Sequence, residues 1–156
     1  MTAKVSEQRS DVFGEGGADA ALGRTVLRRI VSRSLEAMPA GSRVVAIVPD
    51  KTRDDITHIL LPMLTDELTE KRPASFEVLI AQGTHPPMTT EEKDAKAGRM
   101  MWADRLHASL ISDHRWTEPG ELIELGEIGS ETVAAITGGL YGESVRVVVN
   151  RRLSPA

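Results

Sequence analysis

Two short polar segments carry the side chains that are best suited to chemistry. We call them the first elbow, residues 49–55 (PDKTRDD), and the second elbow, residues 82–88 (QGTHPPM). Arg53 offers a planar guanidinium that keeps its charge and matches a carboxylate or a phosphate. His85 is the type of side chain that gives or takes a proton near neutral pH. These two residue types together predict an anion site with an acid/base group beside it.

Three further side chains of the elbows complete the predicted site. Asp50 is expected to orient His85 or Arg53, and the hydroxyl groups of Thr52 and Thr84 are expected to hold a substrate oxygen. A plainer interpretation also exists, because an aspartate after a strand commonly caps a helix and a loop arginine is commonly solvated. Both interpretations stay open, although the loop position of His85 favours a functional role.

The sequence predicts no metal site. It contains no cysteine, which excludes a thiolate zinc site, a disulfide and a cysteine nucleophile. His58, His107 and His114 have no metal-ligand spacing with a third partner, so we interpret them as structural or exposed. Residues 150–152 (NRR) either close the crevice from the last strand or form a solvated chain end, and the second interpretation is the simpler one.

Each elbow follows a predicted strand and precedes a predicted helix. Residues 44–48 (VVAIV) are a short β-branched apolar run, which is typical of a strand covered on both faces, and residues 76–81 repeat this pattern. Two consecutive units of strand, elbow and helix predict right-handed crossovers and a parallel sheet. Because the carboxyl ends of parallel strands meet at one edge, we expect the two elbows to face each other across one crevice.

Each elbow is followed by the sequence signals of a helix. Apolar residues at every fourth position predict a helix over residues 56–71, with an aspartate of residues 54–55 as its N-cap and a bend at Pro62. A capping box in residues 89–92 (TTEE) predicts a short helix that ends at Gly98.

The remaining sequence completes the predicted fold. Residues 1–19 are polar and predict a flexible arm, whereas residues 20–156 predict a single α/β domain that opens with a helix through Leu35. Less regular patterns indicate a helix at 99–105, strands at 108–112 and 122–125, a helix at 130–137 and a strand at 145–149. After that strand a new crossover begins. We therefore predict a Rossmann-like three-layer sandwich with a mostly parallel sheet.

Composition narrows the class of partner. The chain has 156 residues, of which 40% are hydrophobic and 27% charged, as in an ordinary globular domain. A net charge of −4 and an aromatic content of 3% argue against nucleic acid as a partner. The longest apolar runs, residues 44–48 and 59–64, are far shorter than the roughly 20 residues of a membrane span. We expect a cytoplasmic protein that binds neither nucleic acid nor membrane.

Four sequence blocks carry a resemblance to a known family. Residues 48–53 (VPDKTR), 61–64 (LPML), 83–89 (GTHPPMT) and 149–151 (VNR) resemble, in order and spacing, the amino-terminal half of the lactate racemase family. These are nickel-pincer-nucleotide enzymes that racemise or epimerise 2-hydroxy acids. The resemblance covers most of the chain from about residue 43 onward, and the GTH-x-PMT block is its most specific element.

The resemblance implies roles for several residues. His85 matches one of two acid/base histidines, and Arg53 and Asp50 match residues that contact the substrate or support the site. The nickel cofactor of such enzymes accepts a hydride from C2 of the substrate while a histidine removes the hydroxyl proton. Hydride return to the other face then inverts the centre. Asp54 and Pro86 stand where the family usually has proline and arginine, so we expect carboxylate recognition to differ.

Family enzymes are more than twice as long as this chain, which affects the predicted function. The resemblance implies that the second histidine and the residues that hold the pincer cofactor come from sequence beyond Ala156, so the fold is expected to be incomplete. We predict the amino-terminal catalytic half of a 2-hydroxy acid racemase or epimerase, with little or no activity alone. A non-catalytic carboxylate- or phosphate-binding module and a truncated pseudo-enzyme are the alternatives, and a homo-oligomer is left open.

Overall fold

The computed structural model describes residues 14, 16–102 and 110–154. Its elements in chain order are α1 (Arg24–Ser34), β1 (Arg43–Val48), α2 (Thr57–Lys71), β2 (Ser75–Ile80), α3 (Thr90–Ala97), η1 (Arg99–Met101), β3 (Leu110–Asp113), η2 (Pro119–Glu121), β4 (Leu122–Ile128), α4 (Ser130–Ile136), β5 (Val145–Asn150) and η3 (Arg151–Leu153). The η elements are short 3₁₀ turns. None of the helices in this part of the chain combines the length and the apolar character that crossing a lipid bilayer requires.

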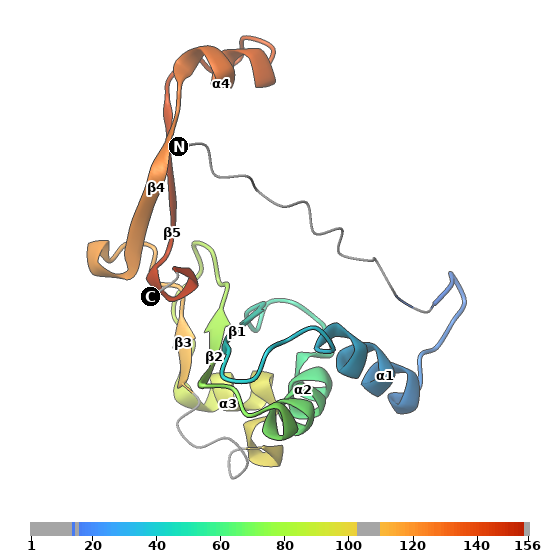
Figure 1. The fold of residues 1–156 in the computed structure, drawn as a ribbon. Coiled ribbons are helices and arrows are strands. Elements are labelled where there is room, and N and C mark those ends of the chain that lie inside the picture. Colours follow the sequence, from blue (N-terminus) through green and yellow to red (C-terminus); the bar gives the residue numbers. More distant parts are fainter. Residues whose placement is uncertain (1–13, 15, 103–109, 155–156) are drawn as a thin grey trace.

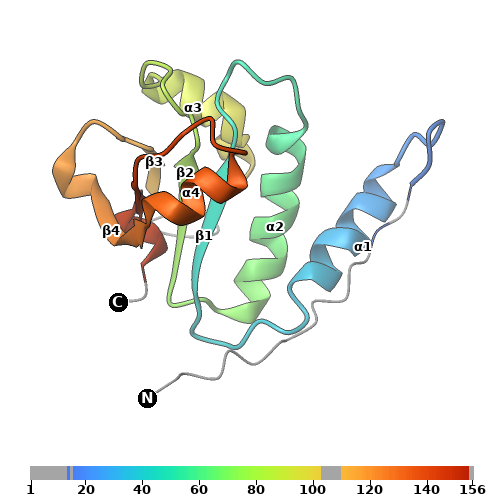
Figure 2. The same ribbon diagram turned by 90° about the horizontal axis from the view of Figure 1, so that it is seen from above.

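The first three strands form a parallel sheet in the order β1-β2-β3 (Figure 1). Val48 pairs with Ile80, and Ile80 pairs with Asp113, so the three carboxyl ends lie at one edge. α2 connects β1 to β2, and α1 lies on the outer side of α2 (Figure 2). The predicted α/β fold with a parallel sheet is therefore confirmed, and the two elbows leave neighbouring strands.

One face of this sheet forms the core. Along β2, Phe76, Val78 and Ile80 alternate toward the helices and are 4%, 0% and 0% exposed. Trp102 closes the far end of this core, where its ring meets the Phe76 ring edge-on at 5.9 Å and its indole N–H donates to the carbonyl of Ala97. A core built mainly of aliphatic side chains is what the low aromatic content required.

The second face of the sheet corrects the sequence prediction. Among the described residues no α-helix packs over it, because α4 stands at the far end of the β4–β5 pair (Figure 1), so the expected third layer is not seen there. Ile47 and Leu110 on this face are 56% and 48% exposed, and the prediction that residues 44–48 are covered on both faces is wrong. The partial cover is η3, whose Arg152 donates to Ser112 and pairs with Glu77.

The last two strands also differ from the expected parallel arrangement. β4 and β5 form a separate antiparallel pair that projects away from the sheet with α4 at its far end (Figure 1). The connection between them, residues 129–144, is long enough for a parallel crossover. It instead places the short α4 at the tip, where Gly138 and Gly139, both with positive φ, turn the chain back so that β5 pairs with β4.

The predicted helix boundaries are mostly correct. α3 has the expected capping box of Thr89 and Glu92 and ends at Gly98. α2 has Ile56 at its N-cap, and Asp55 instead accepts the Thr57 N–H from one residue further out, at 2.8 Å. α1 begins four residues later than expected. The predicted arm falls almost wholly outside the described residues, and only η1 of the predicted helix at 99–105 lies within them.

Pro62 and Gly98 fit together where α2 meets α3. Pro62 has no N–H to donate to the carbonyl of His58, so that carbonyl faces outward from the helix without its usual partner. Gly98 lies against it with φ +60°, and a Cβ on Gly98 would stand 2.6 Å from the His58 oxygen. Only glycine satisfies both conditions at this position.

Gly98→Ala is therefore expected to lower the free energy of unfolding by about 2 kcal/mol or more, from the left-handed conformation and the clash together. Urea unfolding at pH 7 measures the loss. Gly138→Ala is the matched control, because Gly138 has φ +63° with open space around it. An equal loss in both variants would contradict the close contact with His58.

Candidate functional site

Asp50 and His85 meet at the edge where β1 and β2 end. The His85 Nδ1 lies 2.5 Å from Asp50 Oδ2, so the two elbows touch through these side chains. Asp50 is only 4% exposed, whereas the His85 side chain is 51% exposed. The structure thus joins a buried carboxylate to a partly exposed imidazole, residues that are 35 positions apart in the chain.

Thr52 fixes the Asp50 carboxylate from the other side. Its backbone N–H and its hydroxyl both donate to Asp50 Oδ1, at 3.0 and 2.6 Å. The hydrogen bonds from the Thr52 hydroxyl and from His85 lower the pKa of Asp50 to about 2, against the opposing effect of burial. Asp50 is consequently an anion throughout the physiological pH range.

The position of Asp50 determines which nitrogen of His85 is available. An ionised carboxylate only accepts hydrogen bonds, so His85 donates through Nδ1–H. In the neutral imidazole the lone pair then resides on Nε2. Since about half of the side chain is exposed, His85 presents a base to a molecule that binds at this edge of the sheet, and Asp50 stabilises the imidazolium that forms when it takes a proton.

Arg53 and Thr84 lie in the same elbows without contacting His85. Arg53 is exposed, its N–H donates to the Asp50 carbonyl at 3.3 Å, and its carbonyl accepts from Lys96 at 2.8 Å. Among the described residues its guanidinium makes no hydrogen bond or ion pair, so it is available to an anion. Thr84 is exposed as well. The predicted substrate contacts of Arg53, Thr52 and Thr84 stay predictions.

α3 braces the first elbow through residues that were not predicted from the sequence. Glu92 pairs with Lys51, and Lys96 pairs with Asp55 at 2.7 Å. Burial alone would raise the pKa of Asp55, but its hydrogen bonds from Lys96 and Thr57 outweigh this and lower it to about 2. The two lysine–carboxylate pairs span 41 residues each, which no local pattern reveals.

Asp113 performs a similar task for the second elbow. This residue ends β3, is 4% exposed, accepts the Met88 N–H at 3.3 Å and pairs with Lys93 of α3. The loop that carries His85 is therefore tied at His85 to Asp50 and at Met88 to Asp113. Gln82 follows β2, the middle strand of the sheet, whereas Asp50 follows β1 and Asp113 ends β3. The Gln82 side chain is buried, and within the described residues its Oε1 accepts no hydrogen bond.

The described residues do not fit a metal centre. Within them, no group of three histidine, aspartate or glutamate side chains converges in a way that could hold a metal ion. Asp50, Asp55 and Asp113 already accept hydrogen bonds from lysine, threonine, histidine or backbone donors. The resemblance implies that the residues holding a nickel cofactor lie beyond Ala156, and no step of the chemistry below depends on one.

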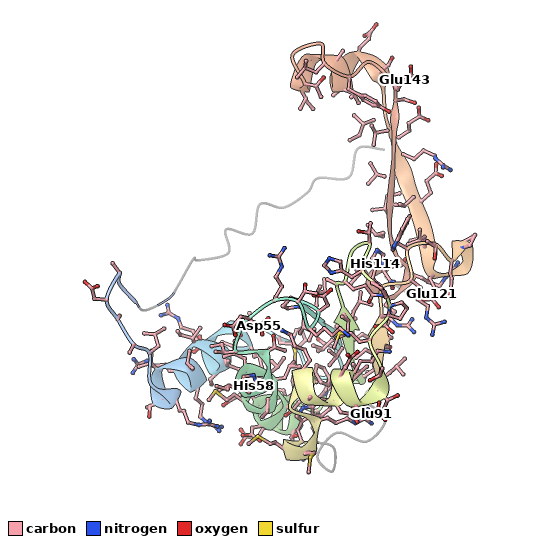
Figure 3. All side chains as sticks on the ribbon, turned by 180° about the vertical axis from the view of Figure 1, so that it is seen from behind. Asp55, His58, Glu91, His114, Glu121 and Glu143 are labelled. Atoms are coloured by element: carbon pink, nitrogen blue, oxygen red, sulfur yellow. The ribbon has the colours of Figure 1, made fainter. Side chains whose placement is uncertain are left out.

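Asn150 and His114 form a second polar contact at this edge, and it corrects the predicted solvated chain end. Asn150 is 3% exposed, and its Nδ2 lies 3.1 Å from His114 Nδ1. Arg151 donates to the carbonyl of Gly120 at 2.7 Å, which ties η3 back to η2. Figure 3 shows His114 and Glu121 where the β4–β5 pair meets the sheet, with Asp55 in the first elbow.

Acid is expected to destabilise the protein through Asp50. The folded-state pKa of about 2 lies below the unfolded value, so the stabilisation is complete above the unfolded pKa and is lost as pH falls from about 5 toward 2. Asp50→Asn, which has no proton to gain, should show a smaller difference in unfolding free energy between pH 7 and pH 3 in urea titrations. Asp54→Asn, at an exposed position of the same elbow, is the control. An unchanged pH dependence in Asp50→Asn would contradict the carboxylate's role.

Three comparisons with known proteins show which family and which fold this chain resembles. The family described as the lactate racemase N-terminal domain matches residues 6–150. Lactate racemases of Thermoanaerobacterium thermosaccharolyticum and Lactiplantibacillus plantarum are each 32% identical to this chain, over 102 and 103 residues, or 64% and 65% of it. A crystal structure of a protein from Thermotoga maritima has a TM-score of 0.73 at 27% identity, covering 83% of this chain and 30% of that one.

The matches also define how much of a relative this chain represents. They cover 24% and 23% of the two lactate racemases, so the chain spans about a quarter of the length of the curated relatives it matches. The resemblance inferred from the four sequence blocks is confirmed, and the match reaches further toward the amino terminus than those blocks do. The chain belongs to the family of lactate racemase N-terminal domains.

Proposed function

We propose that this chain supplies the proton-transferring and carboxylate-binding part of a 2-hydroxy acid racemase or epimerase site. The contact between Asp50 and His85 carries the proposal, because it leaves a basic Nε2 on a partly exposed imidazole. Family membership and the lactate racemase relatives support a lactate-like substrate. The remainder of the site belongs to the part of the fold that relatives contain outside the matched quarter.

His85 moves the proton of the substrate hydroxyl in this scheme. The hydroxyl donates to Nε2, and proton transfer leaves an imidazolium whose Nδ1–H remains bonded to the ionised Asp50. Because the pKa of Asp50 is about 2, the carboxylate does not take the proton itself, and it stabilises the positive ring. Return of the proton from Nε2 to the substrate oxygen restores the starting state whichever enantiomer has formed.

Arg53 binds the substrate carboxylate. Its guanidinium forms two parallel hydrogen bonds to a carboxylate, a geometry that holds a small acid in one orientation. The backbone of Arg53 is held on both sides, by the Asp50 carbonyl and by Lys96, so the side chain extends from a fixed turn. Thr52 acts as a positioning residue, since its hydroxyl proton is donated to Asp50.

Substrate binding distinguishes the two roles. Arg53→Ala is expected to weaken the affinity of this chain for L- or D-lactate about tenfold or more, because it removes a charge-assisted pair. His85→Ala should change that affinity only a few-fold. Isothermal titration calorimetry measures both, with His58→Ala on the exposed side of α2 as the control. Affinity that is insensitive to Arg53 would contradict its assignment.

Turnover tests His85. In the cofactor-loaded polypeptide with the full racemase fold, His85→Gln is expected to lower the rate of lactate racemisation by about 10²- to 10⁴-fold, the usual contribution of a general base. Asp50→Asn should lower kcat with little change in KM, because it disturbs the tautomer rather than the carboxylate contact. Tight binding with a rate unaffected by His85→Gln would instead favour a binding module without an acid/base role.

A further inference from the structure

A cavity open to solvent lies between the uncovered face of the sheet and the β4–β5 pair, and Ile47, Val148 and Leu153 in its walls are 56%, 46% and 41% exposed. It has a volume of about 220 Å³ and is bounded by Ile47 of β1, Leu79 and Ala81 at the end of β2, and residues of β5 and η3. Six of its eight lining residues are aliphatic, and the other two are His114 and Asn150. The cavity is thus apolar with one polar end.

The orientation of the Asn150 amide follows from its contact with η3. The backbone N–H of Arg152 donates to Asn150 Oδ1 at 3.0 Å, and a backbone N–H has no alternative to donating. The atom that receives it must be the amide oxygen. Nδ2, which only donates, therefore faces His114 at 3.1 Å.

This contact fixes the tautomer of His114. Nδ1 accepts from Asn150 and so carries the lone pair, which places the proton of the neutral ring on Nε2. Within the described residues Nε2–H has no hydrogen-bond partner, and it is not among the buried groups without one. His114 is therefore the reverse of His85, since it offers a donor at Nε2 where His85 offers an acceptor.

The walls define what kind of ligand suits this donor. No lysine or arginine lines the cavity, so a bound carboxylate would lose its hydration without gaining a countercharge. A neutral carbonyl oxygen meets the His114 N–H at no such cost, and its apolar remainder is held by the aliphatic walls. The volume of about 220 Å³ leaves room for a single ring, whose outer side stays in contact with solvent because the cavity is open.

We propose that this cavity binds a neutral, mostly apolar small molecule through one carbonyl-type oxygen, which accepts from His114 Nε2–H. The site is independent of the proposed racemase chemistry, because it uses neither His85 nor Arg53. Its defining feature is the chain of contacts from the Arg152 N–H through Asn150 to His114, which gives the cavity its donor.

Nitrogen chemical shifts test the tautomers directly. In long-range ¹H–¹⁵N spectra of the labelled chain, His114 is expected to be protonated at Nε2 and His85 at Nδ1. Asn150→Asp keeps the acceptor for the Arg152 N–H but replaces the donor that faces His114 by a carboxylate oxygen. It should therefore move the His114 proton to Nδ1. The same tautomer for His114 in both proteins would overturn the inference.

Ligand titration tests the site with two matched probes. Acetophenone has a carbonyl oxygen, and ethylbenzene has nearly the same shape without it. Acetophenone should bind about fivefold more tightly than ethylbenzene and more tightly than benzoate, and it should shift the His114 resonances. Asn150→Asp should reduce acetophenone binding to the level of ethylbenzene. Ala81→Leu, which fills the cavity, should weaken both probes and leave the His114 tautomer unchanged.

The variants separate this proposal from the racemase one. Arg53→Ala and His85→Ala should retain acetophenone binding even though they alter lactate binding or turnover. Equal affinities for acetophenone and ethylbenzene, or a preference for benzoate, would overturn the proposal. Changes at His114 that depend on protein concentration and not on the probe would also overturn it, because a second copy of the chain would then cover this face.

Discussion

The buried carboxylate of Asp50 is the constraint on which the rest of the site depends. A carboxylate with 4% exposure is costly unless donors replace its hydration, and here three donors do so, two from Thr52 and one from His85. Two of these donors lie in the turn after β1 and the third in the turn after β2. The hydrogen bonds to this one carboxylate therefore hold the two elbows together, and they also fix the tautomer of His85. Folding and acid/base chemistry rest on the same three hydrogen bonds.

α3 ties the site to the neighbouring strand ends through ion pairs and hydrogen bonds. Glu92 closes the capping box at its own N-terminus and also pairs with Lys51, while Lys93 and Lys96 extend to Asp113 and to the first elbow. Lys93 and Lys96 are 17% and 10% exposed in their side chains, so these pairs are partly desolvated and hold definite geometry better than surface pairs do. One eight-residue helix thus contacts the exits of β1 and β3 and directly follows the loop with His85, which is why that loop has a defined position although the His85 side chain is half exposed.

Local signals in the sequence predicted the parts of the fold that local interactions decide. The β-branched run of β1, the capping box at Thr89 and the terminator Gly98 each act within a few residues, and all three are confirmed. Asp113, Lys93 and Lys96 could not be predicted, because their partners lie 20 to 43 residues away and depend on which strand exits become neighbours. The uncovered face of the sheet escaped prediction for the same reason. An exposed Ile47 and a buried Val48 look alike in an apolar run, and only the position of η3 and the β4–β5 pair distinguishes them.

The two histidines at the sheet edge show how side chains of one type acquire opposite chemistry. Each has Nδ1 bonded to a buried polar side chain, Asp50 for His85 and Asn150 for His114. The first partner accepts a hydrogen bond and the second donates one, so the free Nε2 is a base in His85 and a donor in His114. An ionised carboxylate has acceptors only, so Asp50 fixes the His85 tautomer without a further contact, whereas the Asn150 amide is oriented by the Arg152 N–H that donates to its oxygen. Because a backbone N–H cannot accept, the Asn150 amide keeps this orientation as long as η3 is folded, and His85 keeps its role as long as Asp50 is ionised.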